Sequence, residues 1–189
     1  MVDYLPYLHR KHSTMKHFIS CICLITAFAG LSFAQQETPE DRLEKLGIEL
    51  PPSPPPVANY VNAVTTGNLV FLAGKGPNKG DGTYVTGKVG RDLTIEEGYA
   101  AARLTGISQL AVLKAHLGDL SRVKRIVKVH GMVNCTDDFA NQPEVINGFS
   151  DLMVEVFGDK GKHARAAVGM ASLPRNIAVE IEMIVEIYR

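Results

Sequence analysis

Hydrophobic and polar positions follow two different periods along residues 57–189, and these periods predict its helices and strands. Apolar residues recur every three to four positions after residue 94 and again over 143–157, as on one face of an α-helix. Apolar, β-branched runs predict strands over six segments: 60–64, 69–73, 83–89, 125–133, 164–171 and 177–187. The expected order is therefore β-β-β-α-β-α-β-β.

Turn and cap residues mark the ends of these elements. Thr94, followed three residues later by Glu97, forms a capping box that predicts the start of the first long helix. Gly118 and Gly158 predict the ends of the two helices. The Thr-Thr-Gly-Asn sequence at 65–68 predicts a hairpin turn between the first two strands.

Two helices with about six strands predict an α+β two-layer sandwich. Both helices would cover one face of a mixed sheet. The other face would be apolar enough to need a partner, so we expect a homo-oligomer. Gly131 lies within an otherwise β-prone run, which indicates a bulge or a close approach between subunits.

The first 34 residues have the layout of a secretory signal peptide. Three basic side chains precede an uncharged apolar run over 18–34, which ends in Ser-Phe-Ala. The run is short for a membrane span, which needs about 20 residues, although an uncleaved anchor is the alternative. We therefore expect an exported protein, periplasmic or extracellular, with no membrane attachment after cleavage. Met1 and Met15 both remain possible starts.

Residues 35–56 are expected to join the signal peptide to the folded domain. Thr38 and Pro39 predict the start of a short helix that ends at Gly47. The proline-rich segment 51–56 predicts an extended connector. The folded domain would then comprise residues 57–189.

Charge and cysteine content narrow the classes of function. Residues 35–189 carry 17 basic and 19 acidic side chains, so they have no general attraction to nucleic acid. Only Cys135 lies beyond residue 34, which excludes an intrachain disulfide after cleavage. A domain of about 150 residues buries enough surface to fold without one.

Arg165 is the strongest candidate for binding a small acidic ligand. Its neighbours are small, because residues 164, 166 and 167 are alanine and residue 169 is glycine. They leave room beside a guanidinium, which matches a carboxylate with two parallel hydrogen bonds. The alternative is a structural ion pair between Arg165 and a glutamate.

The last predicted strand supplies candidate carboxylates. Glu180, Glu182 and Glu186 alternate with apolar residues and would share one face. Three acids are ordinary on a solvated face. If that face packs against another subunit, a carboxylate there must be paired or used.

Three other signals do not lead to a site. The glycine-rich loop 74–82 lacks the Gly-Lys-Ser/Thr that opens a phosphate-binding helix. No histidine is placed by sequence to activate Cys135. His116, His130 and His163 are too widely spaced for a metal motif. We expect neither a metal nor a cofactor.

Three C-terminal segments carry a family resemblance. The sequences His-Ala-Arg-Ala-Ala-Val at 163–168, Leu-Pro at 173–174 and Val-Glu-Ile-Glu at 179–182 resemble the signature of the Rid family. These are the reactive-intermediate imine deaminases, also called YjgF or endoribonuclease L-PSP proteins. Further matches, within a resemblance that runs from Asn59 to the C-terminus, are Tyr60, Gly74, Pro77 and Asn147.

The resemblance implies a chorismate-mutase-like fold and a homotrimer with ligand clefts between subunits. It also implies hydrolysis of 2-imino acids such as 2-iminobutanoate to 2-keto acids and ammonia, without metal or cofactor. Arg165 would hold the substrate carboxylate, and Glu180, across an adjacent strand, would position or activate water. Tyr60 and Asn147 would line the cleft, and the backbone at Gly74 would help seat the substrate.

The chain departs from the family pattern at three positions. Ala166 replaces the usual serine, His163 the usual proline, and Ala73-Gly74-Lys75 the usual Ser-Gly-Gln. Each departure touches the expected cleft, which indicates a different substrate or a low activity. Non-enzymatic binding of a small carboxylate at the subunit interface is therefore an alternative function. An endoribonuclease is a third, which the near-neutral charge disfavours.

Overall fold

The computed structural model describes residues 1, 37–53, 55–56 and 58–189. The expected signal peptide, apart from Met1, lies outside these residues. Glu37–Arg189 forms one compact unit, which is the unit analysed below. None of the helices in the described part is long and apolar enough to cross a membrane.

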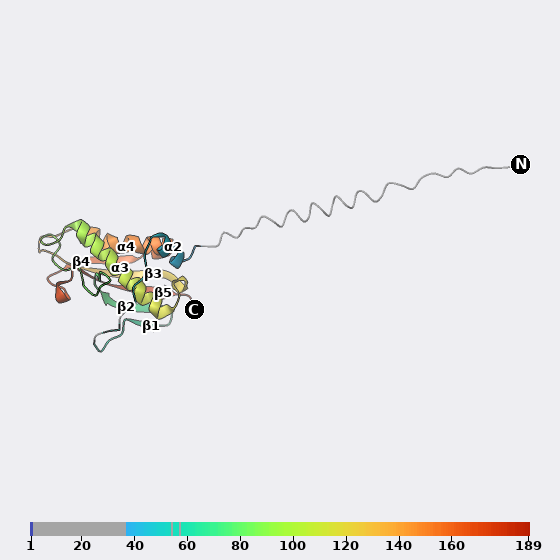
Figure 1. Ribbon diagram of the computed structural model, residues 1–189, viewed down its shortest axis with the longest axis horizontal. Coiled ribbons are helices and arrows are strands. Elements are labelled where there is room, and N and C mark those ends of the chain that lie inside the picture. Colours follow the sequence, from blue (N-terminus) through green and yellow to red (C-terminus); the bar gives the residue numbers. More distant parts are fainter. Residues whose placement is uncertain (2–36, 54, 57) are drawn as a thin grey trace. The chain divides into compact units, whose positions relative to one another are not determined.

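A five-stranded mixed sheet forms one layer of this unit (Figure 1). Its strands lie in the order β1-β2-β5-β3-β4. The β3–β4 pair is parallel and the other pairs are antiparallel. The bounds are β1 (Ala63–Thr66), β2 (Leu69–Lys75), β3 (Val123–Asn134), β4 (Ala164–Met170) and β5 (Val179–Ile187).

The sixth strand, expected over 83–89, is absent. This segment makes only isolated bridges, among them those of Thr86 with Ile177 and of Val89 with Cys135. Gly87 has a φ of 119°, and such backbone cannot continue a regular ladder. The predicted first strand also begins later than expected, because Tyr60 precedes β1 and carries no strand pairing.

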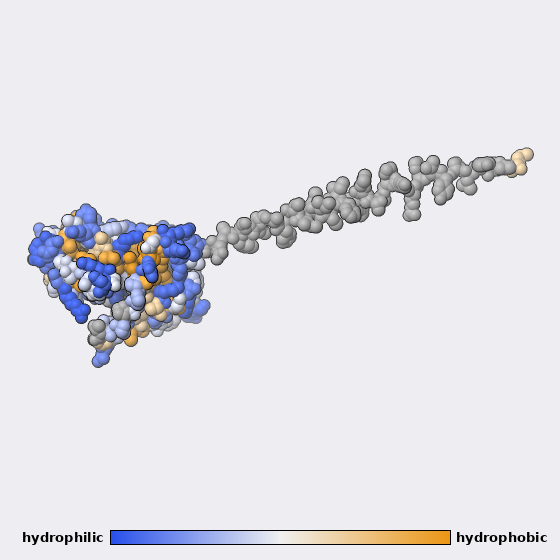
Figure 2. All heavy atoms as spheres, in the orientation of Figure 1, coloured by the Kyte–Doolittle hydropathy of each residue, from blue (hydrophilic) through white to orange (hydrophobic). Residues whose placement is uncertain are grey.

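Two long helices, α3 (Ile95–Leu117) and α4 (Gln142–Phe157), cover one face of the sheet, as predicted. A third and short helix, α2 (Pro39–Lys45), packs against α4. Short 3-10 turns follow α3, α4 and β4 at η2 (Leu120–Arg122), η3 (Gly158–Gly161) and η4 (Pro174–Asn176). In the view of Figure 2, polar residues dominate the outline of the folded unit and an apolar strip lies between them.

The predicted caps form. The Thr94 hydroxyl accepts a hydrogen bond from the Glu97 amide at 3.2 Å, and the Glu97 carboxylate accepts one from the Thr94 amide at 2.8 Å. Gly118 and Gly158 cap the C-termini of α3 and α4 with positive φ. These local signals therefore fix the helix ends independently of the sheet.

Two glycines allow close packing, one between the two long helices and one between the helices and the sheet. A Cβ at Gly148 would lie 2.0 Å from the Tyr99 carbonyl oxygen, so α4 packs directly on the backbone of α3. A Cβ at Gly131 would lie 2.6 Å from Ile146 Cδ1 on α4. Gly131 therefore marks a close approach within the chain, rather than the bulge or subunit contact expected from the sequence.

The two faces of the sheet differ sharply. Along β5 the predicted alternation is confirmed, since Ile181 and Met183 are buried under the helices while Glu182 is exposed. No helix of the described part packs on the opposite face, which we call the open face. It carries exposed apolar side chains, among them Val64, Phe71 and Val168.

Candidate functional site

Arg165 lies on β4, on the helix-covered side of the sheet. It is in register with the fully buried Val129 of β3. Its Nη1 donates to Asn147 Oδ1 at 2.9 Å and to Ser150 Oγ at 3.0 Å, and Nη2 donates to the Pro143 carbonyl at 3.4 Å. The three acceptors are spaced three to four residues apart, on one side of α4.

All of these acceptors are neutral. Within the described residues, no carboxylate lies within 4.0 Å of the Arg165 guanidinium. The structural ion pair considered as the alternative for Arg165 is therefore not formed in this part of the chain. A half-buried guanidinium that is held in place by neutral oxygens keeps its full charge for an anionic ligand.

His163 contacts Ser150, one of the residues that hold the Arg165 guanidinium. Its Nδ1 lies 2.6 Å from the Gly161 carbonyl, which can only accept, so Nδ1 carries a proton. Its Nε2 lies 3.1 Å from Ser150 Oγ and accepts from the hydroxyl when the ring is neutral. Burial lowers the pKa of His163, and the nearby charge of Arg165 lowers it further, against the opposing effect of the Gly161 bond. Ser150 therefore links a neutral imidazole to Arg165.

Glu180 lies on β5 and faces the other way, toward the open face. A Cβ at Gly74 would lie 2.2 Å from Glu180 Oε1, so the carboxylate rests against the backbone of β2. Burial raises the pKa of Glu180, and the like charge of Glu182 adds to the effect. A half-buried carboxylate with a raised pKa is a suitable general base. Gly74 and Glu180 are thus brought together, as Arg165 and Asn147 are.

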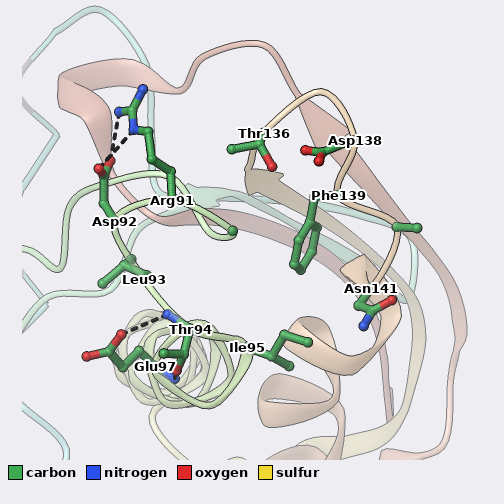
Figure 3. A pocket seen from close by; sticks show the side chains of 12 residues that line it. Arg91, Asp92, Leu93, Thr94, Ile95, Glu97, Thr136, Asp138, Phe139 and Asn141 are labelled. Atoms are coloured by element: carbon green, nitrogen blue, oxygen red, sulfur yellow. Dashed lines mark hydrogen bonds and ion pairs between the residues drawn. The ribbon is translucent and has the colours of Figure 1, made fainter.

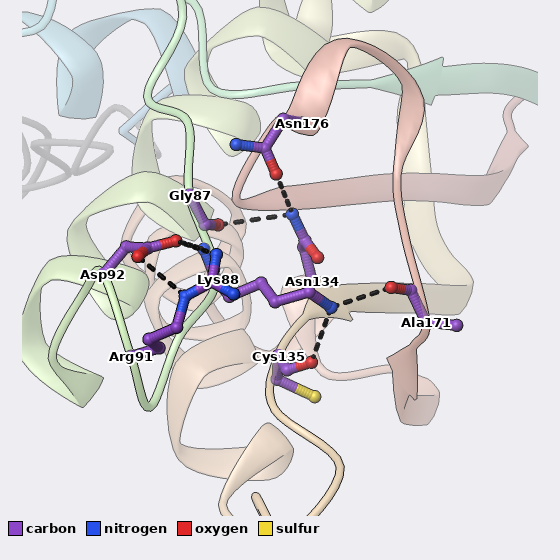
Figure 4. Close-up of polar contacts among 8 residues, drawn as sticks. All are labelled: Gly87, Lys88, Arg91, Asp92, Asn134, Cys135, Ala171 and Asn176. Atoms are coloured by element: carbon purple, nitrogen blue, oxygen red, sulfur yellow. Dashed lines mark hydrogen bonds and ion pairs between the residues drawn. The ribbon is translucent and has the colours of Figure 1, made fainter.

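A hydrogen-bonded network anchors the turn that leads into β5 (Figure 4). The side-chain amide of Asn134 donates to Asn176 Oδ1 at 2.9 Å and toward the Gly87 carbonyl at 3.4 Å. Arg175 and Asn176 both have positive φ, of 55° and 58°, a conformation that non-glycine residues rarely adopt. The network holds this strained turn, and with it the register of Glu180.

Lys88 connects the segments that follow β3 and β4. Its ammonium donates to the carbonyls of Ala171 at 2.7 Å and Cys135 at 3.0 Å, while the Cys135 sulfur points away from it (Figure 4). Cys135 is a buried free thiol, and its sulfur lies 3.7 Å from Gln142 Nε2. These contacts assign both side chains to loop anchoring.

The expectation that Arg165 and Glu180 lie on adjacent strands is wrong. Strand β3 lies between β4 and β5, and the two side chains project from opposite faces of the sheet. They also differ by three register positions along β3, from Val129 to Met132, which is roughly 10 Å. Strand order is not encoded in local sequence, which explains the error.

Two further expected positions lie elsewhere. Tyr60 is exposed in the segment before β1, at the sheet edge opposite β4. Lys75, one of the three departures assigned to the cleft, pairs with the buried Ile181 and lines a cavity with residues of α3. It therefore faces the helices, on the opposite side of the sheet from Glu180.

A cavity of about 610 Å³ lies between the starts of α3 and α4, and no predicted site residue lines it (Figure 3). Phe139 points into it, and two of its carboxylates, Asp92 and Glu97, make local structural contacts. The Arg91 guanidinium and the Lys88 amide lower the pKa of Asp92 to about 2, and Glu97 caps α3. No group of three or more His, Cys, Asp and Glu side chains that could hold a metal occurs among the described residues.

Sequence reasoning found Arg165 and Asn147 but missed Ser150 and the structural role of His163. Helical spacing could have indicated Ser150, because it lies one turn after Asn147 and two turns after Pro143. Nothing in the local pattern indicated that His163 would bond to Ser150, since the contact joins a helix to the start of a strand.

The fold and the Arg165 environment define an α+β, chorismate-mutase-like protein with a guanidinium held by neutral oxygens at the sheet edge. The family model described as "YjgF/chorismate mutase-like, putative endoribonuclease" matches residues 40–187. The chain therefore belongs to the YjgF/RidA/L-PSP family.

Three known proteins illustrate this membership. A 2-iminobutanoate/2-iminopropanoate deaminase of Dermatophagoides farinae is 35% identical over 74% of this chain and 94% of its own length. The crystal structure of Atu1372 from Agrobacterium tumefaciens, a protein of unknown function, is 46% identical, has a TM-score of 0.73 and covers 79% of this chain and 92% of its own. An endoribonuclease-like protein of Shewanella oneidensis is 34% identical, with a TM-score of 0.77 and coverage of 79% and 99%.

Proposed function

We propose that this protein hydrolyses 2-imino acids to 2-keto acids and ammonia, with Arg165 holding the substrate carboxylate. The observation that carries the proposal is the Arg165 guanidinium, which is fixed by Asn147, Ser150 and the Pro143 carbonyl and has no carboxylate partner among the described residues. The deaminase name of the 35% identical relative supports the same reaction class.

The reaction needs orientation and one base. The iminium carbon is electrophilic, and water adds to it as Glu180 accepts a proton, which gives a carbinolamine. Glu180 then returns that proton to nitrogen, the C–N bond breaks to release ammonia, and Glu180 accepts the hydroxyl proton as the keto group forms. The raised pKa of Glu180 suits a group that both accepts and returns a proton.

The proposal requires more than one copy of the chain. Because Arg165 and Glu180 project from opposite faces, one substrate can reach both only if they come from different subunits. The exposed apolar side chains of the open face, such as Phe71 and Val168, would be covered in such an assembly. We propose a homotrimer with clefts between its subunits, in which Tyr60 and Asn147 line each cleft.

The N-terminal 34 residues add a proposal about location. Their basic start and apolar run favour export followed by cleavage after Ala34. The imine source would then lie outside the cytoplasm. N-terminal sequencing of the protein recovered from the producing cells would test this directly.

Non-enzymatic binding of a small carboxylate is the second candidate. It is favoured by Ala166, which removes a hydroxyl that the family usually has next to the arginine. The clamp at Arg165 would remain, but an interaction with the reacting atoms would be lost. Stabilisation by 2-keto acids without turnover would favour this candidate over the deaminase.

The test is a coupled assay in which an amino-acid oxidase generates 2-iminobutanoate. We expect the wild-type protein to accelerate imine decay and Arg165→Ala to lose about 10- to 100-fold in kcat/KM, the value of a charge-assisted hydrogen bond. Arg103→Ala, which removes a helix-surface ion pair with Glu155, is the matched control. Unchanged imine decay with wild-type protein, or full activity of Arg165→Ala, would contradict the proposal.

A further inference from the structure

A second cavity, of about 310 Å³, lies on the helix-covered side of the sheet. Neither Arg165 nor Glu180 lines it. It is enclosed by the proline-rich segment 51–53, the glycine-rich loop after β2 and the outer side of α3. One wall is apolar and includes Pro51, Pro52 and Val112.

Lys75 provides the charge in this cavity. It ends β2 in register with the buried Ile181, so its side chain leaves the strand toward α3. Its ammonium donates to Asn62 Oδ1 at 2.6 Å. No carboxylate of the described residues lies within 4.0 Å of it. The charge is thus partly desolvated and not neutralised.

The remaining polar lining is neutral, since no Asp or Glu contributes to the cavity. Asn78 Oδ1 already accepts from the Gly80 amide at 2.8 Å, which leaves the Asn78 amino group as its available donor. Tyr84 and Ser108 contribute hydroxyl groups. A cavity with one cation, neutral donors and an apolar wall is complementary to a small amphipathic anion.

We propose that this cavity binds a small monocarboxylate with a short apolar chain or ring, at a site separate from the catalytic one. The carboxylate would pair with the Lys75 ammonium, and the apolar part would lie against the prolines and Val112. A bound anion would restore the electrostatic stabilisation that Lys75 loses on burial. A neutral analogue would gain only the apolar contacts.

Burial also lowers the pKa of Lys75. A carboxylate binds the protonated amine, so binding would raise this pKa and draw a proton from solution. The affinity should therefore fall with rising pH, beginning below the usual titration range of a lysine.

The experiment is calorimetric titration of the full chain with benzoate and isovalerate, with benzamide as the neutral analogue. We expect benzoate or isovalerate to bind wild-type protein and Arg165→Ala with the same Kd, and Lys75→Met to bind about tenfold or more weakly. Lys79→Met, an exposed lysine in the same loop, is the matched control. Benzamide should also bind at least tenfold more weakly.

A second variant keeps the proposal testable if Lys75→Met fails to fold. Ser108→Phe would fill the cavity from α3 without altering Lys75, and it should also abolish binding. Unchanged affinity in both variants would overturn the proposal, as would no binding of either carboxylate to wild-type protein at millimolar concentration. Loss of binding in Arg165→Ala alone would assign the carboxylate to the catalytic site instead.

Discussion

Arg165 makes three hydrogen bonds within the described residues, and these leave part of its guanidinium without a partner there. Both N–H groups of Nη1 are used by Asn147 and Ser150, and one of Nη2 is used by Pro143. No hydrogen bond from Nε–H occurs among the described residues, and adjacent N–H groups on Nε and Nη2 have the spacing of a carboxylate. The side chain is therefore oriented by α4 and has N–H groups left for the substrate carboxylate that we propose.

The neutral His163, which contacts Ser150 beside Arg165, gives a prediction for the pH dependence of stability. Its folded-state pKa lies below that of the unfolded chain, so between the two values the unfolded state binds more protons. Stability should fall as pH drops from about 7 through the lowered pKa. We expect His163→Asn to show a smaller loss of melting temperature between pH 7.5 and pH 5.0 than the wild type.

His116→Asn is the control for that measurement, because His116 is exposed on the helix end and bonds only to Thr65 within the described residues. It should keep the wild-type pH dependence. An undiminished loss of stability in His163→Asn would show that the imidazole is not held neutral by its surroundings.

Gly74 gives a second residue-scale prediction. A methyl group there would collide with the Glu180 carboxylate and displace it without removing it. Displacement of a catalytic group by about 1 Å costs on the order of 100-fold, so we expect Gly74→Ala to lower kcat/KM by about 10- to 100-fold. The double variant Gly74→Ala with Glu180→Gln should be no less active than Glu180→Gln alone, since both act through one carboxylate. Additive losses in the double variant would contradict this mechanism.

At the scale of elements, the contact between α3 and α4 depends on Gly148. Its Cβ would lie 2.0 Å from a backbone oxygen of α3, and backbone atoms cannot move aside as a side chain can. We expect Gly148→Ala to lower the free energy of unfolding by about 2–3 kcal/mol, the usual effect of overpacking. Chemical denaturation would measure it, and Glu144→Ala, at an exposed position of the same helix, should change stability by less than about 0.5 kcal/mol. Equal stability of Gly148→Ala and wild type would show that the helices can separate freely.

The elements that could be predicted from sequence are those whose ends are locally encoded. Thr94 with Glu97, Gly118 and Gly158 set the limits of α3 and α4 through hydrogen bonds within a few residues. The segment 83–89 has a strand-like composition, but glycines with positive φ on either side of it interrupt the ladder. Whether this segment pairs as a strand depends on the backbone conformation around it, and amino-acid composition alone does not predict that conformation.

In the candidate site, too, the local contacts and the long-range arrangement must be considered separately. Asn147 accepts a hydrogen bond from Arg165, and the backbone of Gly74 lies against the Glu180 carboxylate. What could not be predicted is that these two pairs lie on opposite faces, because β3 enters the sheet between β4 and β5. That order results from long-range pairing, which no local pattern in β4 or β5 specifies.

At the scale of the whole molecule, Arg165 and Glu180 of one chain lie too far apart to act on the same substrate. The two groups can act on one substrate if each cleft combines Arg165 of one copy with Glu180 of another. In the assembly that we propose, the exposed apolar residues on the open face would be covered. Assembly and catalysis would then be inseparable.

Mixing two inactive variants tests this claim most directly. Arg165→Ala and Glu180→Gln chains, co-expressed with different affinity tags and purified as mixed oligomers, would be assayed for imine hydrolysis beside each variant alone. In a trimer that contains both variants, one cleft in three combines an unaltered Arg165 with an unaltered Glu180, so we expect recovery of about a third of wild-type activity. Mixed oligomers as inactive as the two parents would contradict a shared site.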